Sequence, residues 1–249
     1  HGQSPIPILA PSTPGDCFHT ALEAFRIAVQ YMTPVIILSD GYLANSAEPW
    51  LIPDIEALER TSIEFAQAPE VGEFMPYARN PETLARPWAI PGTPGLEHRI
   101  GGLTKQDGTG NVSYDADNLG KMIALRKQKV EGIASSLPPI EVDGPDSGEL
   151  LVVGWGGTRG SITAAVEEAR AEGLAVSQIH LRHLNPFPSN LGETLGRFRK
   201  VLLPELSDGH LAMLLRSRYL VDIQAVNKTD GQPFKVAELS EAIRKLYGS

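Results

Sequence analysis

The fold class is decided by the stretch Leu150-Leu-Val-Val-Gly-Trp-Gly-Gly-Thr-Arg-Gly160. Its first four residues are apolar, as in a strand buried on both faces, and a glycine-rich turn follows them. Residues 161–172 then repeat apolar side chains at helical spacing, and Gly173 ends the run. The order strand, turn, helix predicts an α/β fold.

The same alternation continues toward the C-terminus. Further strands are predicted at 175–184, 201–203 and 220–225, with helices at 191–198, 209–219 and 235–247. Strands and helices that alternate at this rhythm indicate a parallel sheet with helices on both faces. We therefore expect residues 150–225 to form a self-contained α/β unit, within a domain that spans 149–249.

The first 45 residues predict a strand–helix–strand crossover. Residues 6–10 form a first strand, and Thr13 caps a helix that has Pro14 at its first position and Asp16 in its first turn. The helix places Phe18, Leu22, Phe25, Val29 and Met32 on one inward face. Val35–Leu38 is a second strand, expected to be buried on both faces. One crossover is too small to form a sheet domain, so the remaining strands must come from upstream sequence or from a partner.

Residues 46–148 follow a different pattern. They are rich in proline, and the only strong helical periodicity lies at 117–133. Pro138–Gly148 has the composition of a linker. The predicted domains are therefore 1–45, a long irregular connecting segment at 46–148, and 149–249.

Composition excludes several classes of protein. The net charge of −8 and the absence of long basic runs argue against nucleic acid as a partner, and no apolar run reaches the ~20 residues of a membrane span. Cys17 is the only cysteine, so these residues can form no disulfide with one another and no iron–sulfur site, which favours a reducing, cytoplasmic location. The chain begins with His1 and has no signal peptide, so we expect it to be a piece of a longer protein.

Two motifs with possible chemistry are better explained by structure. The turn 154–160 is one residue longer than a dinucleotide fingerprint, and the next strand lacks the acidic residue that would bind a ribose. We interpret it as a tight turn that lets a helix pack against the sheet. His180 and His183 are three apart on a strand, where they face opposite sides and cannot share a metal ion.

Four residues remain as candidates for ligand contact. Asp40 follows the strand 35–38, where parallel sheets place ligands, although a helix cap explains it equally well. The densest polar stretch is Glu97–Gly110, in which His98, Arg99 and Lys105 would suit an anionic ligand. A solvated loop is an equally good explanation of its composition. No spacing of residues assigns a catalytic group.

Several of these stretches together resemble one family. Pro5–Phe18, Thr33–Ala44, Glu97–Gly110 and Arg182-His-Leu-Asn-Pro-Phe-Pro188 resemble the α subunit of 2-oxoglutarate:ferredoxin oxidoreductases, which belong to the 2-oxoacid:acceptor oxidoreductases. The resemblance continues through 201–206, 211–220 and 231–234. The chain departs from the family pattern at Leu119 and at Ser207-Asp208, so those positions inherit no role.

The resemblance implies a fold and a reaction. Residues 1–45 would end a thiamine-type pyrimidine-binding domain, and a transketolase C-terminal-like parallel-sheet domain would follow. The whole enzyme would decarboxylate a 2-oxoacid, expected to be 2-oxoglutarate, on thiamine diphosphate, pass electrons through an iron–sulfur cluster to ferredoxin, and transfer the acyl group to coenzyme A. A β subunit would hold Mg²⁺, the cluster and most of the thiamine diphosphate.

The same resemblance predicts what this chain does by itself. It would hold none of these cofactors alone, would be inactive alone, and would need the upstream part of the α subunit and the β subunit. His98, Arg99, Lys105 and Asp40 are the candidate contacts to substrate or coenzyme A. The alternative is a non-catalytic assembly or binding module of the transketolase C-terminal type.

Overall fold

The computed structural model describes residues 3–248, so the first two residues of the predicted segment 1–45 and the last residue of the predicted domain 149–249 lie outside it. The chain divides into two compact units. The first unit contains the described residues up to Ile8, Leu22–Ile36 and Leu51–Ser136. The second contains Leu9–Ala21, Ile37–Trp50 and the residues from Leu137 onward. Because short segments near the N-terminus are shared between them, the units do not follow the order of the sequence.

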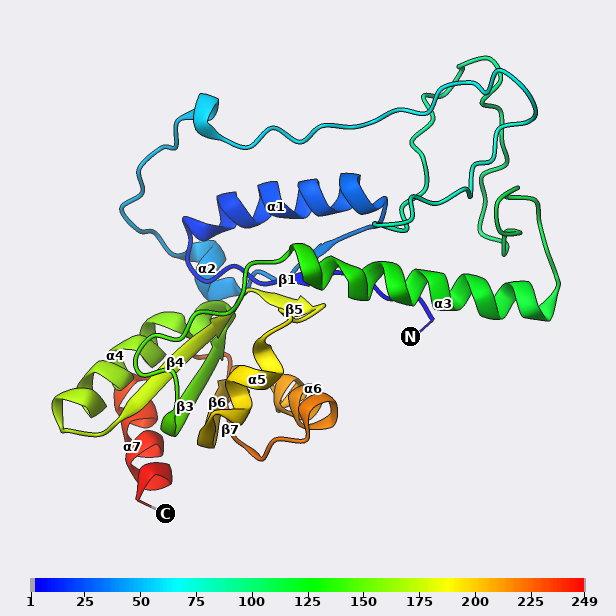
Figure 1. The fold of residues 1–249 in the computed structure, drawn as a ribbon. Helices are drawn as coiled ribbons and strands as arrows, with labels where there is room; N and C mark the ends of the chain where they lie inside the picture. Colours follow the sequence, from blue (N-terminus) through cyan, green and yellow to red (C-terminus); the bar gives the residue numbers. More distant parts are fainter. Residues whose placement is uncertain (1–2, 249) are drawn as a thin grey trace. The chain divides into compact units, whose positions relative to one another are not determined.

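The second unit contains a four-stranded parallel sheet, as predicted (Figure 1). Its strands are β3 (Gly148–Trp155), β4 (Val176–Leu181), β6 (Phe198–Glu205) and β7 (Ile223–Asn227), in the spatial order β4-β3-β6-β7. The helices are α4 (Arg159–Ala171), α5 (Leu191–Gly196), α6 (His210–Tyr219) and α7 (Val236–Tyr247). The α/β class expected from the sequence is confirmed.

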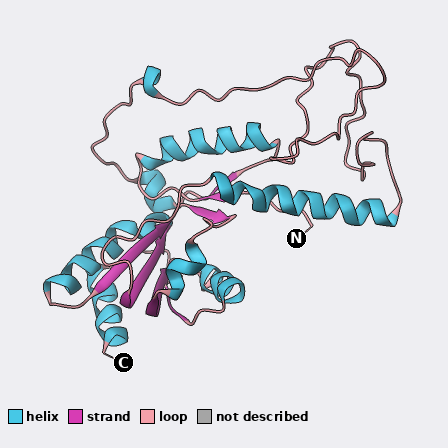
Figure 2. Ribbon diagram, viewed as in Figure 1, coloured by secondary structure: helices cyan, strands magenta, loops and turns pink. Residues whose placement is uncertain are grey.

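Each face of this sheet carries its own hydrophobic core. Leu151 and Val153 of β3 point to the side covered by α5 and α6, and Leu150 and Val152 point to the side covered by α4 and α7. Successive residues of a strand face opposite sides, which is why a continuous apolar run is needed when both sides are covered. Figure 2 shows the helices on the two faces of the strands.

A buried carboxylate joins the sheet to α6. Glu205 ends β6 and is fully buried, and it accepts hydrogen bonds from the backbone N–H groups of Leu211 (3.0 Å) and Ala212 (2.8 Å). These amides belong to the first turn of α6, where no intrahelical partner exists for them. Gly209, just before the helix, has φ of +78°, a conformation that favours glycine. The helix is therefore anchored by its N-terminal end.

The N-terminal crossover is also present. β1 (Ile8–Leu9) lies between β2 (Ile36–Ile37) and β5 (His183–Asn185), and α1 (Asp16–Tyr31) connects β1 to β2. The short helix α2 (Gly41–Asn45) follows β2. The oxygen Oγ1 of Thr13 accepts a hydrogen bond from the N–H of Asp16 at 3.2 Å, as expected for the predicted cap, but the helix begins at Asp16 and not at Pro14.

Two predictions about burial in this region are wrong. Ile36 and Ile37 of β2 are 41% and 39% exposed, although the strand was expected to be buried on both faces. Phe18 and Phe25 of α1 are 36% and 57% exposed. The buried face of the helix instead consists of Thr20, Ala24, Ile27 and Tyr31. Apolar spacing identifies side chains that favour burial, but whether they are covered depends on other segments.

The residues that connect α2 to β3 in the sequence are mostly irregular. It contains the 3₁₀ turn η1 (Ile55–Ala57), the helix α3 (Ala116–Gly132) and the 3₁₀ turn η2 (Ile133–Ser136). Isolated bridges join Phe65 to Trp88, Tyr77 to Gly108 and Lys105 to Val112. The predicted helix at 117–133 corresponds to α3.

The segment 138–148 is not a free linker, contrary to our expectation. Asp143 forms a two-way backbone bridge with Gln178 of β4, with N···O distances of 2.9 and 3.0 Å, and its carboxylate pairs with Arg170 at 3.0 Å. The segment thus lies along the edge of the sheet.

Across residues 3–248, the structure contains no helix with both the length and the apolar character that crossing a bilayer would require.

Candidate functional site

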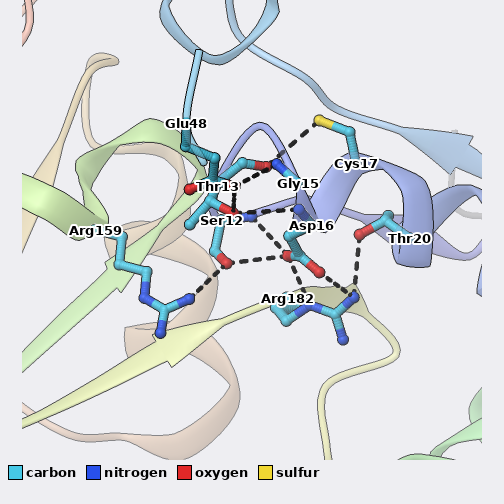
Figure 3. Close-up of polar contacts among 9 residues, drawn as sticks. All are labelled: Ser12, Thr13, Gly15, Asp16, Cys17, Thr20, Glu48, Arg159 and Arg182. Atoms are coloured by element: carbon cyan, nitrogen blue, oxygen red, sulfur yellow. Dashed lines mark hydrogen bonds and ion pairs between the residues drawn. The ribbon is translucent and has the colours of Figure 1, made fainter. Parts of the chain in front are cut away.

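A polar network surrounds the start of α1, in the second unit (Figure 3). The Asp16 carboxylate accepts hydrogen bonds from the backbone N–H (2.8 Å) and the hydroxyl (3.0 Å) of Ser12. Arg182, which follows β4, donates from Nε at 2.9 Å and pairs through Nη2 at 2.8 Å with the same carboxylate. Two segments that are 166 residues apart in the sequence are joined here by a bidentate pair.

The network holds Asp16 in its charged form. Burial raises the pKa of this carboxyl, but hydrogen bonds from Arg182 and Ser12 outweigh it, so the pKa is lower than usual. Arg182 also donates to the hydroxyl of Thr20 at 3.1 Å. Because Asp16 and Arg182 satisfy one another, the pair fixes the turn in place.

Arg159 lies at the edge of this network. Its Nη1 donates to the Ser12 hydroxyl at 3.0 Å, and both residues border a cavity of about 610 Å³ in the second unit. His180 lines the same cavity; its Nε2 is buried and has no hydrogen-bond partner among the described residues. Burial and the nearby charge of Arg159 lower the His180 pKa to about 4, so the ring is neutral. The cavity is therefore lined by cationic, hydroxyl and neutral imidazole groups, together with the carboxylates of Glu141 and Asp143.

The glycine-rich turn after β3 binds a carboxylate of its own chain. Asp40 accepts hydrogen bonds from the N–H of Leu43 (2.8 Å), as the cap of α2, and from the N–H of Gly157 (2.7 Å). A Cβ on Gly154 would lie 2.7 Å from Cδ1 of Ile162 in α4, so glycine allows the two elements to pack closely without a shift of that side chain. The turn thus packs a helix against the sheet, and one of its amides is already used by Asp40.

His98 and Arg99 lie together in the first unit. Both line a cavity of about 470 Å³ formed by the loops around residues 68–76 and 95–111. His98 Nδ1 is 2.8 Å from the carbonyl of Leu96, and its ring packs edge-on against Phe74 at 5.4 Å. Arg99 is exposed and makes no hydrogen bond or ion pair within the described chain. The imidazole is thus held in place while the guanidinium is free to bind.

Lys105 differs from His98 and Arg99 in its surroundings. It is only 4% exposed, and its ammonium donates to the carbonyls of Gly101 (3.0 Å) and Leu103 (2.7 Å). Its own carbonyl accepts from Asn118 of α3 at 2.9 Å. Lys105 therefore organises the loop 101–105 and does not line the cavity of His98 and Arg99. Asp40, the fourth candidate, belongs to the second unit.

Sequence reasoning missed Ser12, Arg159 and Arg182 as members of one network. Asp16 was assigned only to the helix dipole, because a partner 166 residues away leaves no local pattern. The available signal was that Arg182 belongs to the quoted stretch 182–188. Such long-range pairs become visible only when the strand ends are placed together.

Two protein-family models, both from one class of enzymes, match successive parts of the chain. Residues 2–116 match the model described as "Pyruvate flavodoxin/ferredoxin oxidoreductase, thiamine diP-bdg". Residues 148–239 match "Pyruvate:ferredoxin oxidoreductase core domain II". The fold and these matches define the class as 2-oxoacid:acceptor oxidoreductases.

Individual relatives agree with this class. The chain is 54% identical over 245 residues to the "2-oxoglutarate oxidoreductase subunit KorA" of Mycobacterium tuberculosis, covering 98% of this chain and 37% of that protein. It is 29% identical over 202 residues to "2-oxoacid:ferredoxin oxidoreductase 1, subunit alpha" of Aeropyrum pernix, covering 80% of this chain and 31% of that protein. The sequence resemblance is confirmed, and the chain belongs to the family of 2-oxoacid:ferredoxin oxidoreductase α subunits.

One solved structure is similar along the whole chain. It is the 2-oxoglutarate:ferredoxin oxidoreductase from Magnetococcus marinus with 2-oxoglutarate, coenzyme A and succinyl-CoA bound, with a TM-score of 0.91 at 26% identity. The match covers 99% of this chain and 43% of that one. The chain therefore spans less than half the length of these relatives.

Proposed function

We propose that the chain forms part of the α subunit of a 2-oxoglutarate:ferredoxin oxidoreductase. The reaction would convert 2-oxoglutarate and coenzyme A into an acyl-CoA thioester and CO₂, while two electrons reduce ferredoxin. The observation that carries the proposal is the 54% identity over 98% of the chain to a 2-oxoglutarate oxidoreductase subunit. The solved relative with bound 2-oxoglutarate and succinyl-CoA supports the choice of substrate.

Thiamine diphosphate would supply the electron sink for decarboxylation, and the match to a thiamine-binding model supports its presence in the enzyme. A four-iron or two-iron cluster needs about four cysteines, and Cys17 is the only cysteine of these 249 residues. Residues 3–248 also contain no group of three or more metal-ligating side chains. We therefore assign Mg²⁺ and the cluster to a β subunit. Ferredoxin would bind to the assembled enzyme, which we place in the cytoplasm.

Within this chain, the candidate residues take different roles. Arg99 is exposed and unpaired, so it is suited to contact an anionic substrate or the phosphates of coenzyme A. His98 borders the same cavity and is oriented by the Leu96 carbonyl. Lys105 and Asp40 are engaged by backbone groups, so we assign them positioning roles.

The domain division also remains a proposal. We assign residues 1–45 to a thiamine-type domain, 46–148 to a connecting segment and 149–249 to the domain of the parallel sheet. The alternative of a non-catalytic assembly module is disfavoured, because the thiamine-binding model extends over residues 2–116 as well as the C-terminal match.

The test uses the protein isolated with its co-purifying subunits. We expect reduction of a viologen dye that requires both 2-oxoglutarate and coenzyme A. A complete complex that reduces the dye with neither 2-oxoglutarate nor any other 2-oxoacid would refute the proposal. Activity of residues 1–249 alone would refute the division of labour between subunits.

Arg99→Ala should raise KM for 2-oxoglutarate about tenfold in the complex and leave kcat within about twofold, because a charged hydrogen bond contributes ~1.5–3 kcal/mol to binding. Arg60→Ala is the matched control, since Arg60 is exposed and pairs only with Glu56 on the surface. Equal KM values for the two variants would remove Arg99 from the site.

A further inference from the structure

Four cationic side chains gather in the first unit. Arg79 and Arg86 belong to the irregular segment, and Arg126 and Lys129 lie on α3. Residues three apart on a helix share a face, so Arg126 and Lys129 project together. All four are partly buried. We call them the basic cluster.

Arg79 and Arg86 surround one aromatic ring. Their guanidinium carbons lie 5.7 Å and 4.5 Å from the ring centroid of Tyr77. Arg79 also donates from Nη1 to the carbonyl of Leu84 at 3.1 Å. These contacts hold the two side chains in position but neutralise neither charge.

Arg126 and Lys129 are no better compensated. The Lys129 ammonium donates to the carbonyl of Met32 at 3.0 Å. Arg126 makes no hydrogen bond within residues 3–248, and its Nε is buried without a partner, as is the Nε of Arg79. Within the same residues, no member of the basic cluster forms an ion pair, although nine other cations do, for example Lys121 with Asp107 at 2.6 Å.

This arrangement is costly without an anion. Burial, and then repulsion from Arg79, Arg86 and Arg126, lowers the pKa of Lys129 to about 8. Asp107 is the nearby acid that favours the charge of Arg79, and it is already paired with Lys121. Partly buried cations without counter-charge destabilise a fold unless an anion compensates them. The cluster therefore has the electrostatics of an anion-binding site.

A cavity adjoins the cluster and gives an anion access to it. It has a volume of about 570 Å³, which is in the size range of small-molecule sites. Arg79, Arg86 and Asn80 contribute polar groups to its lining, and Phe65 and Trp88 contribute rings. Its lining also includes one carboxylate, that of the exposed Glu64.

We propose that the basic cluster and this cavity bind the phosphate group of a small molecule. A phosphate dianion balances two of the four charges, and its oxygens match the fork of two guanidinium groups, whereas one carboxylate balances a single charge. The remainder of the cavity, which the rings of Phe65 and Trp88 line, would hold the organic part of the ligand. The site does not depend on the proposed reaction, because it rests on charges that the chain leaves unpaired.

The test measures binding to the protein isolated with its co-purifying subunits. Calorimetry with adenosine 3′,5′-bisphosphate and with inorganic phosphate should give saturable binding, and Arg79→Gln or Arg126→Gln should raise Kd about tenfold or more. Arg60→Gln, the surface control, should leave Kd unchanged. Kd values that neither cluster variant alters would overturn the proposal, and so would tighter binding of 2-oxoglutarate that the same variants abolish.

A second measurement separates binding from folding. Without ligand, Arg126→Gln should leave the thermal midpoint unchanged or raise it, because the side chain makes no hydrogen bond and is repelled by its neighbours. A lower midpoint would assign the cluster a structural role. Binding of inorganic phosphate by the isolated chain that disappears in the complex would assign it to an acidic surface of another subunit. Either result would overturn the small-molecule site without affecting the proposed reaction.

Discussion

The parallel sheet and the irregular segment differ in how their apolar residues are used. In the sheet, Leu150, Leu151 and Leu203 are completely buried between helices of the same chain. In the irregular segment, Leu51 is 91% exposed and Val71 is 92% exposed. The sheet thus completes its own core, and the segment keeps its shape through isolated bridges and side-chain contacts with the backbone.

The two regions also differ in the charged side chains that they leave available to a ligand. Arg99 and the basic cluster, which form no ion pair within the described residues, lie in the first unit with the irregular segment. In the sheet unit, several charged groups form ion pairs, as Asp16 does with Arg182. A region that satisfies its own polar groups has less to offer a ligand than one that leaves charges free.

The largest expected effect tests the comparison directly. Leu203→Ala should reduce the free energy of unfolding by roughly 2–5 kcal/mol, because it leaves a cavity in a closed core. Leu51→Ala should change it by less than about 0.5 kcal/mol, since the side chain is already in water. Urea titration of both variants measures the two values. Similar losses would mean that Leu51 is buried in the protein in solution.

A second effect comes from His180, at the edge of the sheet, whose Nε2 is buried without a hydrogen-bond partner among the described residues. His180 has a folded pKa of about 4, below its unfolded value near 6.5, so the unfolded state takes up the proton first. Stability is therefore complete above pH ~6.5 and falls as the pH drops toward 4, by at most about 3 kcal/mol.

His180→Gln should remove this part of the pH dependence, as measured by urea midpoints at pH 7.5 and pH 5. His210→Gln is the control, because His210 is exposed. A parental pH dependence that persists in His180→Gln would show that the buried ring is not its source.

The smallest expected effect is local to the irregular segment. Lys105→Met keeps the length of the side chain but loses both hydrogen bonds to carbonyls, which should destabilise the loop by about 1–2 kcal/mol. Hydrogen exchange should accelerate at Gln106 and Ser113, whose amides bond within the loop. Lys127→Met, on the exposed side of α3, should leave exchange at those amides unchanged. Unaltered exchange in Lys105→Met would contradict its role in ordering the loop.

The spacing of apolar residues was sufficient to locate a strand or helix where the whole pattern lay within one continuous segment. The sequence located β3 and α4 within a few residues of their observed bounds, from the apolar runs at 150–153 and 161–172 and the glycines between and after them. The same reasoning misjudged α1 and β2, because it identified apolar side chains without knowing what covers them. Site residues were harder still to predict: the local composition indicated Arg99, but Arg159 and Arg182 gave no local signal.

The sequence by itself determined the α/β class, the order of the strands and helices in the C-terminal unit, and the resemblance to the oxidoreductase family. These depend on spacing and on stretches that are continuous in the chain. Only the tertiary structure decided that Asp40 caps a helix and binds the turn at Gly157, that Lys105 is buried, and that Arg79, Arg86, Arg126 and Lys129 come together without a counter-charge. Such facts depend on distances between residues far apart in the sequence, and a local pattern carries no information about those distances.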